Sequence, residues 1–391
     1  MACESRIYDC GIVALYASEI TPDEFAGELA RQAAASGAAI ASIFFSRSAI
    51  DPHALADAMR KHVPDLRYVG CSTAGEITPR GYAQETIIAM LFPAGRFAAT
   101  ATLIQGISKL RMESVIAQVD AMRNAFEAGA RGSMFSVLLI DGLSRAEEAV
   151  TSTLYWSLDD IPLVGGSSGD SLRFEKTWLI HNGVVATDCA IVVLVKTSVP
   201  FRIFKTENFK PTSDKLVVTA SDPDRRTVHE FNAEPAAEAY AAAIGTNAGA
   251  LTPMSFASYP LVVRVGGEYY CRSIQKLNPD GSLSFYCAID NGIVLTIAQP
   301  KGMVESTREK LKEVAGHLGG IDVVLGFDCV LRRLDAENRQ SFKAISDLYR
   351  DNRIIGFGTY GEQYRSMHLN QTFTGIAFGT APPPAVVTVA D

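Results

Sequence analysis

The sequence lacks the features that mark several common protein classes. No apolar run could span a bilayer, and one of the longest, CAIVVLV at residues 189–195, is far too short. The N-terminal residues include acids and no apolar segment, so no secretory signal is expected. Positive charge is not in excess, since 36 Lys and Arg face 43 Asp and Glu. We therefore expect a soluble, cytoplasmic protein that uses neither nucleic acid nor membrane as a partner.

The cysteines form no CxxC pair. Seven are present, at positions 3, 10, 71, 189, 271, 287 and 329. An odd number without paired spacing argues against a disulfide framework and against a zinc ribbon. Most of these thiols are expected to be small buried hydrophobic groups.

An internal repeat is present. The phrase GCSTAGEI at 70–77 returns as GFGTYGEQ at 356–363, and a variant, LVGGSSGDSL, stands at 163–172. Each copy consists of a predicted buried strand, an amphipathic helix, a strand that ends in a glycine turn, and a further strand. We therefore predict a fold built by duplication.

The repeated turn has two compatible interpretations. Its glycines let the chain leave a central strand at angles that a Cβ would forbid. The turns of different copies could also line a shared cleft and present their polar residues to a ligand. Nucleotide binding is not expected, because glutamate follows Gly75 and Gly361 where a phosphate loop needs lysine.

Residues 196–320 differ from the repeat. Strands joined by the turns GG (266–267) and NPDG (278–281) predict hairpins, and helices are expected in 234–245 and 303–320. The fold class predicted for the whole chain is mixed α/β. Duplicated strand-helix-strand-strand units would form packed sheets flanked by helices, in an αββα-like body with two pseudo-equivalent halves.

Four phrases, VGCSTAGEI, LVGGSSGD, LGFDCVLRR and TYGEQ…HLNQTFTG, resemble the FIST family of two-part sensory domains. The resemblance covers residues 10–380. It implies a FIST-N-like domain at 1–205 and a FIST-C-like domain at 206–380. The proline-rich end, 381–391, is predicted to be a flexible tail.

The resemblance implies an intracellular sensor of bacterial signal transduction. No enzyme is expected, because neither Cys71 nor Asp141 has a recognisable catalytic partner in the sequence. Among stand-alone FIST proteins the chain is similar to the NosP group, which is described as haem-containing nitric-oxide sensors. Those proteins regulate a partner histidine kinase and thereby quorum sensing, cyclic-di-GMP or biofilm formation. Other FIST domains imply a small-metabolite ligand, such as an amino acid, without haem.

Two histidines are candidate axial ligands for a haem iron. His368 is the first choice, because Tyr360, Glu362 and Gln371 surround it with polar groups in a segment that is otherwise core-like. His181, at the end of an apolar run, is the second choice. The alternative for His368 is a satisfied polar network that braces a sheet.

Arg332 and Arg333 follow an apolar strand and could clamp a carboxylate, either a haem propionate or that of an amino acid. The alternative is a pair of structural ion pairs with Asp335 and Glu337.

A further alternative is an iron–sulfur cluster or thiolate metal site that uses Cys71, Cys287 or Cys329. Cys287 would face Cys271 or Arg272 across a hairpin, depending on a one-residue difference in register. An exposed edge strand could also support a homodimer.

Overall fold

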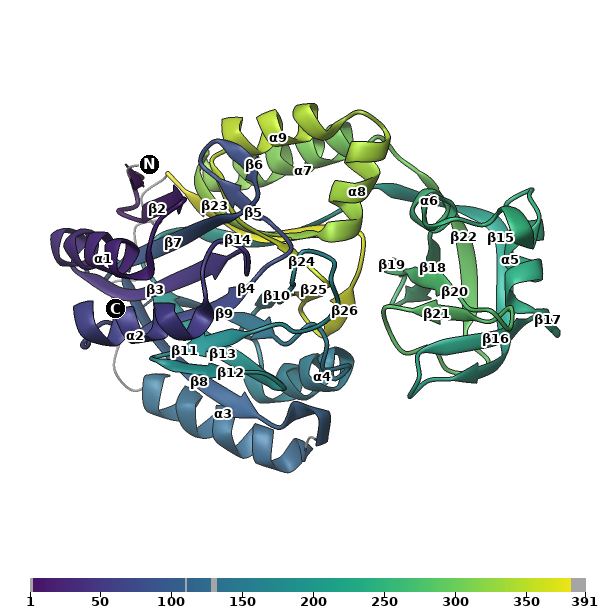
Figure 1. The fold of residues 1–391 in the computed structure, drawn as a ribbon, viewed down its shortest axis with the longest axis horizontal. Helices are drawn as coiled ribbons and strands as arrows, with labels where there is room; N and C mark the ends of the chain where they lie inside the picture. The colour runs from purple at the N-terminus through teal and green to yellow at the C-terminus, as the bar shows by residue number, and fades with distance from the viewer. Residues whose placement is uncertain (1–2, 110, 128–131, 381–391) are drawn as a thin grey trace, which may run out of the picture.

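The computed structural model describes residues 3–109, 111–127 and 132–380. Within these residues the chain forms a three-sheet body and a smaller β-rich subdomain that stands beside it (Figure 1). The predicted mixed α/β class, with helices flanking packed sheets, is confirmed. The predicted tail, 381–391, lies outside the described residues. No helix in the described part is long and apolar enough to cross a membrane.

Each sheet of the body is built mainly from one copy of the repeat. Two parallel strands lie at its centre, and two further strands follow in antiparallel order. In the first sheet the order is β2 (Val13–Ser18), β7 (Thr86–Pro93), β3 (Ala38–Phe45), β4 (Tyr68–Ser72), with β1 (Glu4–Ile7) outside β2. In the second it is β8 (Phe97–Gln105), β13 (Cys189–Thr197), β9 (Ser133–Ile140), β10 (Leu163–Ser167). In the third it is β14 (Phe201–Glu207), β27 (Thr372–Gly379), β23 (Ile321–Cys329), β24 (Ile354–Thr359).

A hairpin from another copy completes each sheet. The hairpin after β4, β5 (Glu76–Thr78) and β6 (Gly81–Ala83), pairs with β24. The hairpin after β24, β25 (Glu362–Tyr364) and β26 (Met367–Leu369), pairs with β10. The hairpin after β10, β11 (Leu179–His181) and β12 (Val184–Ala186), pairs with β4.

This cyclic exchange corrects the predicted two pseudo-equivalent halves. The body has three equivalent units, because each copy gives its hairpin to a second copy and receives one from the third. The middle copy, at 163–172, also gives one hairpin and receives another, although its turn is shorter than the other two.

The arrangement explains why each repeated phrase has its first glycine. Gly70, Gly165 and Gly356 lie on the second of the two parallel strands of each sheet. A Cβ at any of them would overlap a carbonyl oxygen of the adjacent parallel strand. The oxygens belong to Ile43, Leu138 and Gly326, respectively. Glycine is thus needed for the close approach of two backbones.

One apolar core lies between the three sheets. Aromatic rings from all three meet there, with Phe44 and Phe357 at a centroid distance of 4.5 Å and Phe135 and Phe378 at 5.9 Å. Helices cover the outer faces of the sheets (Figure 1). They are α1 (Pro22–Ser36), α2 (Pro52–His62), α3 (Met112–Glu127), α4 (Glu147–Leu158), α7 (Met303–Leu318), α8 (Val330–Asn338) and α9 (Phe342–Asp351).

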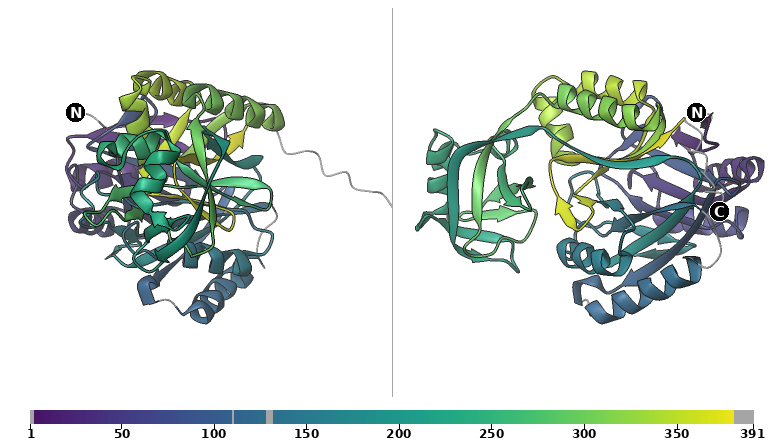
Figure 2. Two further views of the ribbon diagram at one scale, coloured as in Figure 1. Left: turned by 90° about the vertical axis from the view of Figure 1, so that its right-hand side faces the viewer. Right: turned by 180° about the vertical axis from the view of Figure 1, so that it is seen from behind.

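The subdomain is inserted into the third copy, between β14 and α7 (Figure 2). It has its own apolar core. The predicted hairpins β18–β19 and β20–β21 and the predicted helices at α5 and α7 are confirmed. The subdomain comprises β15 (Phe209–Asp222), β16 (Thr227–Phe231), β17 (Glu234–Pro235), α5 (Ala236–Ala243), α6 (Pro253–Ser258), β18 (Leu261–Val265), β19 (Glu268–Arg272), β20 (Ile274–Leu277), β21 (Leu283–Phe285) and β22 (Val294–Pro300).

Candidate functional site

A cavity of about 740 Å³ lies between the three-sheet body and the subdomain. The body contributes the loop after β9, the loop after β10 and the glycine turn after β24, and the subdomain contributes β16, β20, β21 and the adjoining turns. The lining side chains used below are Arg145, Glu147, Phe174, Arg225, Arg226, His229, Lys276, Asp280, Tyr286 and Tyr360. The volume is in the range of small-molecule binding sites.

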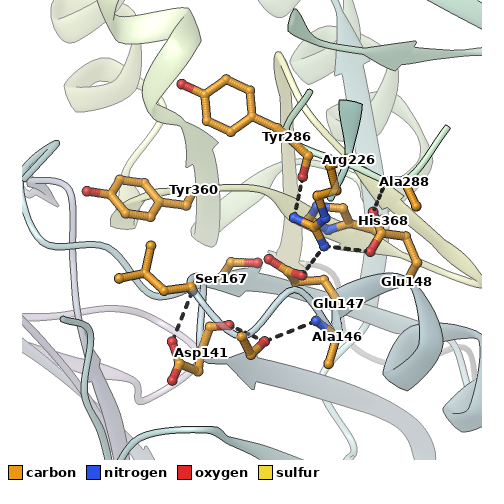
Figure 3. A network of polar contacts seen from close by, with 12 residues as sticks. Asp141, Ala146, Glu147, Glu148, Ser167, Arg226, Tyr286, Ala288, Tyr360 and His368 are labelled. Atoms are coloured by element: carbon orange, nitrogen blue, oxygen red, sulfur yellow. Dashed lines mark hydrogen bonds and ion pairs between the residues drawn. The ribbon is translucent and has the colours of Figure 1, made fainter. Parts of the chain in front are cut away.

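Arg226 reaches from the subdomain to the first turn of α4 (Figure 3). Its Nη2 lies 2.6 Å from Glu147 Oε2 and 2.9 Å from Glu148 Oε2. Its Nη1 donates to the carbonyl oxygen of Tyr286 at 2.6 Å, and the amide of Ala288 donates to Glu148 Oε1 at 3.2 Å. The N-terminal end of a helix favours negative charge, which suits the two carboxylates at this place.

Negative charge is in excess at this end of the cavity, because the single guanidinium of Arg226 pairs with the two carboxylates of Glu147 and Glu148. Burial raises the pKa of Glu147 to about 7, although Arg226 acts in the opposite direction. A second cationic group near Glu147 would therefore be favourable.

The other charged side chains in the cavity wall are mainly basic. Arg145, Arg225 and Lys276 line the cavity, and none of them has an ion-pair partner in the part of the chain that the structure describes. Such cations offer charge-assisted hydrogen bonds to an anionic group. The cavity thus combines an acidic end with unpaired bases.

An aromatic wall closes the cavity on the side of the body. The rings of Phe174 and Tyr360 stack with their centroids 4.8 Å apart. The Tyr360 hydroxyl donates to the Asp170 carboxylate and accepts from the amide of Leu172 at 2.8 Å. Asp170 also accepts from the amides of residues 174–176. Tyr360, one of the predicted site residues, is therefore held in place as part of the cavity wall.

Three lining residues have strained backbone. Arg145, Phe174 and Arg226 have φ angles of 60°, 54° and 53°, in the left-handed region that non-glycine residues seldom adopt. Such residues persist where the surrounding structure fixes them, and they gather at ligand sites. This supports the cavity as a binding site.

His368, the first-choice haem ligand, lies on β26 and not in the cavity lining. It is 3% exposed, and its Nδ1 lies 3.2 Å from Nε2 of the Gln363 side chain. Burial lowers its pKa to about 4. A Cβ on Gly361 would overlap the ring edge that carries Cε1 and Nε2, so that edge packs against the glycine turn. An axial ligand needs a free nitrogen beside a flat apolar space, and these surroundings do not fit haem.

His181, the second choice, lies on β11 in the first sheet. Its ring makes a hydrogen bond to the backbone of Ala101 on the edge strand β8, and burial lowers its pKa. Its Nε2 has no hydrogen-bond partner among the described residues. The structure does not bring His181 and His368 to one site, because they lie on hairpins in different sheets.

Arg332 and Arg333 also lie outside the cavity lining. Arg332 is fully buried, with Nε 2.7 Å from Asp328 Oδ1 and further contacts to Asn208, Thr307 and Tyr349. Arg333 lies over the glycine turn at Gly75 and pairs with Glu337 at 3.0 Å. Both arginines form structural ion pairs, as in the alternative considered for them, but Arg332 pairs with Asp328, because Asp335 pairs with Arg339.

The three candidate cysteines lie in three different apolar clusters. All are buried, and burial raises the pKa of the Cys71, Cys287 and Cys329 thiols. The ladder of this hairpin runs from Ile274–Phe285 to Leu277–Leu283, so Cys287 lies beyond it, and Cys271 pairs with Val262 on β18. Within the described residues, no three His, Cys, Asp or Glu side chains lie close enough to hold a metal ion.

Glu362 belongs to a buried polar network next to β27. Glu362 accepts hydrogen bonds from the hydroxyls of Thr359 and Thr372 and from the amide of Thr372. Gln371 lies in the turn before β27 with a φ of 55°. Glu76 has the same surroundings in the first copy, formed by Thr73, Thr86 and Ser46.

The comparison with known families matches two domains in tandem. The FIST N domain matches residues 39–234 and the FIST C domain matches residues 236–365. The chain belongs to the FIST family. FIST domains are associated with signal transduction, in which they sense small ligands, and they are sensory and not catalytic. The matched boundary falls inside the inserted subdomain, whereas our predicted boundary, 205/206, falls within β14.

One curated relative is an uncharacterized protein of Methanocaldococcus jannaschii. It is 22% identical over 190 residues, which make up 47% of the present chain. The match covers 36% of the length of that relative.

Sequence reasoning missed most of the cavity. Arg226 is far in the sequence from Glu147 and Glu148, and none of the three belongs to the repeated turn. The available signals were two adjacent acids that open a helix after a central strand and two adjacent arginines in a turn. Neither local pattern predicts that the start of the helix and the arginine turn come into contact in the fold.

Proposed function

We propose that this FIST protein is a sensor of a small zwitterionic metabolite, such as an amino acid, which binds in the cavity between body and subdomain. The observation that carries the proposal is the division of charge. Glu147 would face the ammonium group, and the unpaired bases Arg145, Arg225 and Lys276 would attract the carboxylate. The stacked rings of Phe174 and Tyr360 offer an apolar surface to the side chain of the ligand.

A thermal-shift panel of the twenty amino acids tests this function. A ligand at one hundred times its Kd stabilises the folded state by about 2.7 kcal/mol, so the midpoint should rise by roughly 3 °C. The Arg225→Gln/Lys276→Gln double variant should bind at least about tenfold more weakly in calorimetry, because it loses charged contacts. Arg264→Gln is the matched control, since Arg264 is exposed on β18 outside the lining. The proposal fails if no amino acid moves the midpoint of the natural sequence.

Haem-based sensing of nitric oxide, with a histidine kinase as partner, stays a prediction from the resemblance. The packing of His368 against Gly361 gives it no support. The absorption spectrum tests it, on protein made with ample iron and haem precursor. A Soret band that shifts with nitric oxide would favour haem over the metabolite. Broad bands typical of iron–sulfur clusters would favour the cysteine alternative.

A further inference from the structure

The subdomain is connected to the body by two antiparallel strands, β15 and β22 (Figure 2). Their pairing begins at Phe209 and Pro300 and is interrupted by a register shift between Pro211 and Lys215. An irregularity of this kind bends a strand and breaks its ladder of hydrogen bonds. Regular backbone pairing is therefore interrupted a few residues from the body, where the Thr212 hydroxyl donates to the Ile297 carbonyl oxygen at 2.8 Å.

The base of this connection is fixed. The amide of Lys301 donates to the carbonyl oxygen of Asn208 at 2.6 Å, which holds the two strands together where they leave the body. The buried guanidinium of Arg332 lies 3.4 Å from Asn208 Oδ1. A bend would therefore occur beyond this anchor, at 211–215.

A second group of contacts, away from this connection, holds the subdomain to α4. Arg226 is 9% exposed and reaches both Glu147 and Glu148, and Ala288 bonds Glu148 through its amide. Nearby, Arg272 Nη1 donates to the carbonyl oxygen of His368 at 3.3 Å.

The guanidinium of Arg226 is held firmly on the side of the subdomain. The carbonyl oxygen of Tyr286 accepts from Nη1 at 2.6 Å, and the Arg226 carbonyl accepts from the amide of Phe285 at 2.8 Å. Arg226 thus moves with the subdomain, while Glu147 and Glu148 move with the body. Removing one partner of a buried ion pair is costly, because the other charge is left uncompensated.

We infer that Arg226 and the Glu147–Glu148 pair form a latch that holds the inserted subdomain over the cavity, and that the subdomain swings about residues 211–215 when the latch is broken. Hinges of this kind are a few residues at the ends of elements. Both Arg226 and Glu147 line the cavity, so a ligand there would act directly on the latch. That regulatory meaning rests on the proposed function.

The test measures the distance between body and subdomain in the full chain without any ligand. Spin labels would be placed at Ala117→Cys on α3 and Asn247→Cys in the subdomain, both exposed positions. The background carries Cys3→Ser, because the other six native thiols are buried. Pulsed dipolar spectroscopy should give a narrow distance distribution for this reference protein. Arg226→Gln should shift it or widen it at least about twofold.

Arg264→Gln is the matched control and should leave the distribution narrow. An unchanged distribution in a folded Arg226→Gln variant, or equal widening in the control, overturns the latch. If Arg226→Gln does not fold by circular dichroism, Glu147→Gln/Glu148→Gln replaces it, with the same expected and overturning results. Because no ligand is present, failure of the amino-acid panel would refute the proposed function and leave this measurement standing.

Discussion

At the scale of single residues, Glu76 and Glu362 occupy the same place in two copies of the repeat. Each is fully buried and accepts hydrogen bonds from threonine hydroxyls. Burial raises the pKa of Glu76 to about 7 and that of Glu362 to about 8, against the opposing effect of those hydrogen bonds. These carboxyl groups thus hold protons in the folded state at pH values where the unfolded chain has lost them.

This linkage predicts that the free energy of unfolding falls as the pH rises. The pKa of this carboxyl group is 4.5 in the unfolded chain. The contribution of Glu362 to the free energy of unfolding is therefore complete below pH 4.5 and is lost as the pH rises through its folded-state pKa of about 8. One such group contributes up to about 1.4 kcal/mol per pH unit. Glu362→Gln, which cannot ionise, should reduce the change in the free energy of unfolding with pH between pH 5 and 8, as measured by urea unfolding. Glu234→Gln, at an exposed position, should leave the slope as it is. An unchanged slope in Glu362→Gln would contradict the raised pKa.

Sequence reasoning was informative about the chemistry of these residues and not about their place. A polar cluster in a core-like segment indicated a hydrogen-bonded network, and Glu362 is paired with Thr359 and Thr372. Gln363 Oε1 and Asn370 Oδ1, next to His368, have no partner among the described residues.

Arg333 pairs with Glu337, as the local sequence indicated. The contacts of Arg332 with Asn208 and Thr307 come from distant parts of the chain, which sequence alone cannot bring together. Arg226 was missed because its partners lie in a helix of another copy.

At the scale of elements, the closely paired parallel strands explain the repeated glycines. Gly165 on β10 lies against the carbonyl oxygen of Leu138 on β9. By contrast, Gly316 within α7 has open space where a Cβ would stand. Gly165 is therefore required for steric reasons, whereas nothing near Gly316 requires a glycine.

Gly165→Ala should lower the free energy of unfolding by about 3 kcal/mol or more, because the new Cβ forces two backbones apart. Gly316→Ala should raise it by about 0.4–1 kcal/mol, because alanine is the better helix former and fits without strain. Urea unfolding of both variants beside the natural sequence gives the comparison. Equal effects at the two positions would show that the close approach of β9 and β10 does not matter.

The elements themselves were largely predictable, since strand and helix periods are local properties of the sequence. The buried strands β3, β9 and β23, helix α7 and the hairpins of the subdomain follow from local patterns. The partners of the hairpins do not. The hairpin at 76–83 pairs through β5 with β24, which lies far away in the sequence. Long-range contacts and not a local pattern determine this pairing.

At the scale of the whole molecule, the subdomain is an insertion whose ends nearly meet. Asn208 and Lys301 are joined by a backbone hydrogen bond of 2.6 Å, and the body has its own core without the intervening strands. Loops whose ends are close tolerate large changes in what lies between them. The cavity, however, depends on both parts.

Replacing residues 209–300 by a short glycine-serine linker should therefore leave a folded body. The expected result is a cooperative thermal transition with helical circular dichroism, at a midpoint somewhat below that of the full chain, because Glu147 and Glu148 lose Arg226. This body should show no thermal shift with any amino acid that stabilises the full chain, since it lacks Arg225 and Lys276. A body that aggregates or unfolds without cooperativity would contradict its independence.

The cyclic exchange of hairpins also sets the order in which a growing chain can finish its structure. The second sheet has β8, β9, β10 and β13 as soon as residue 197 has left the ribosome, yet its edge at β10 stays unpaired until β25 is made at residues 362–364. Domains usually fold in the order of their synthesis, but here none of the three units is closed by its own copy alone. The nascent chain must carry open strand edges through most of translation, and the last hairpin closes the ring.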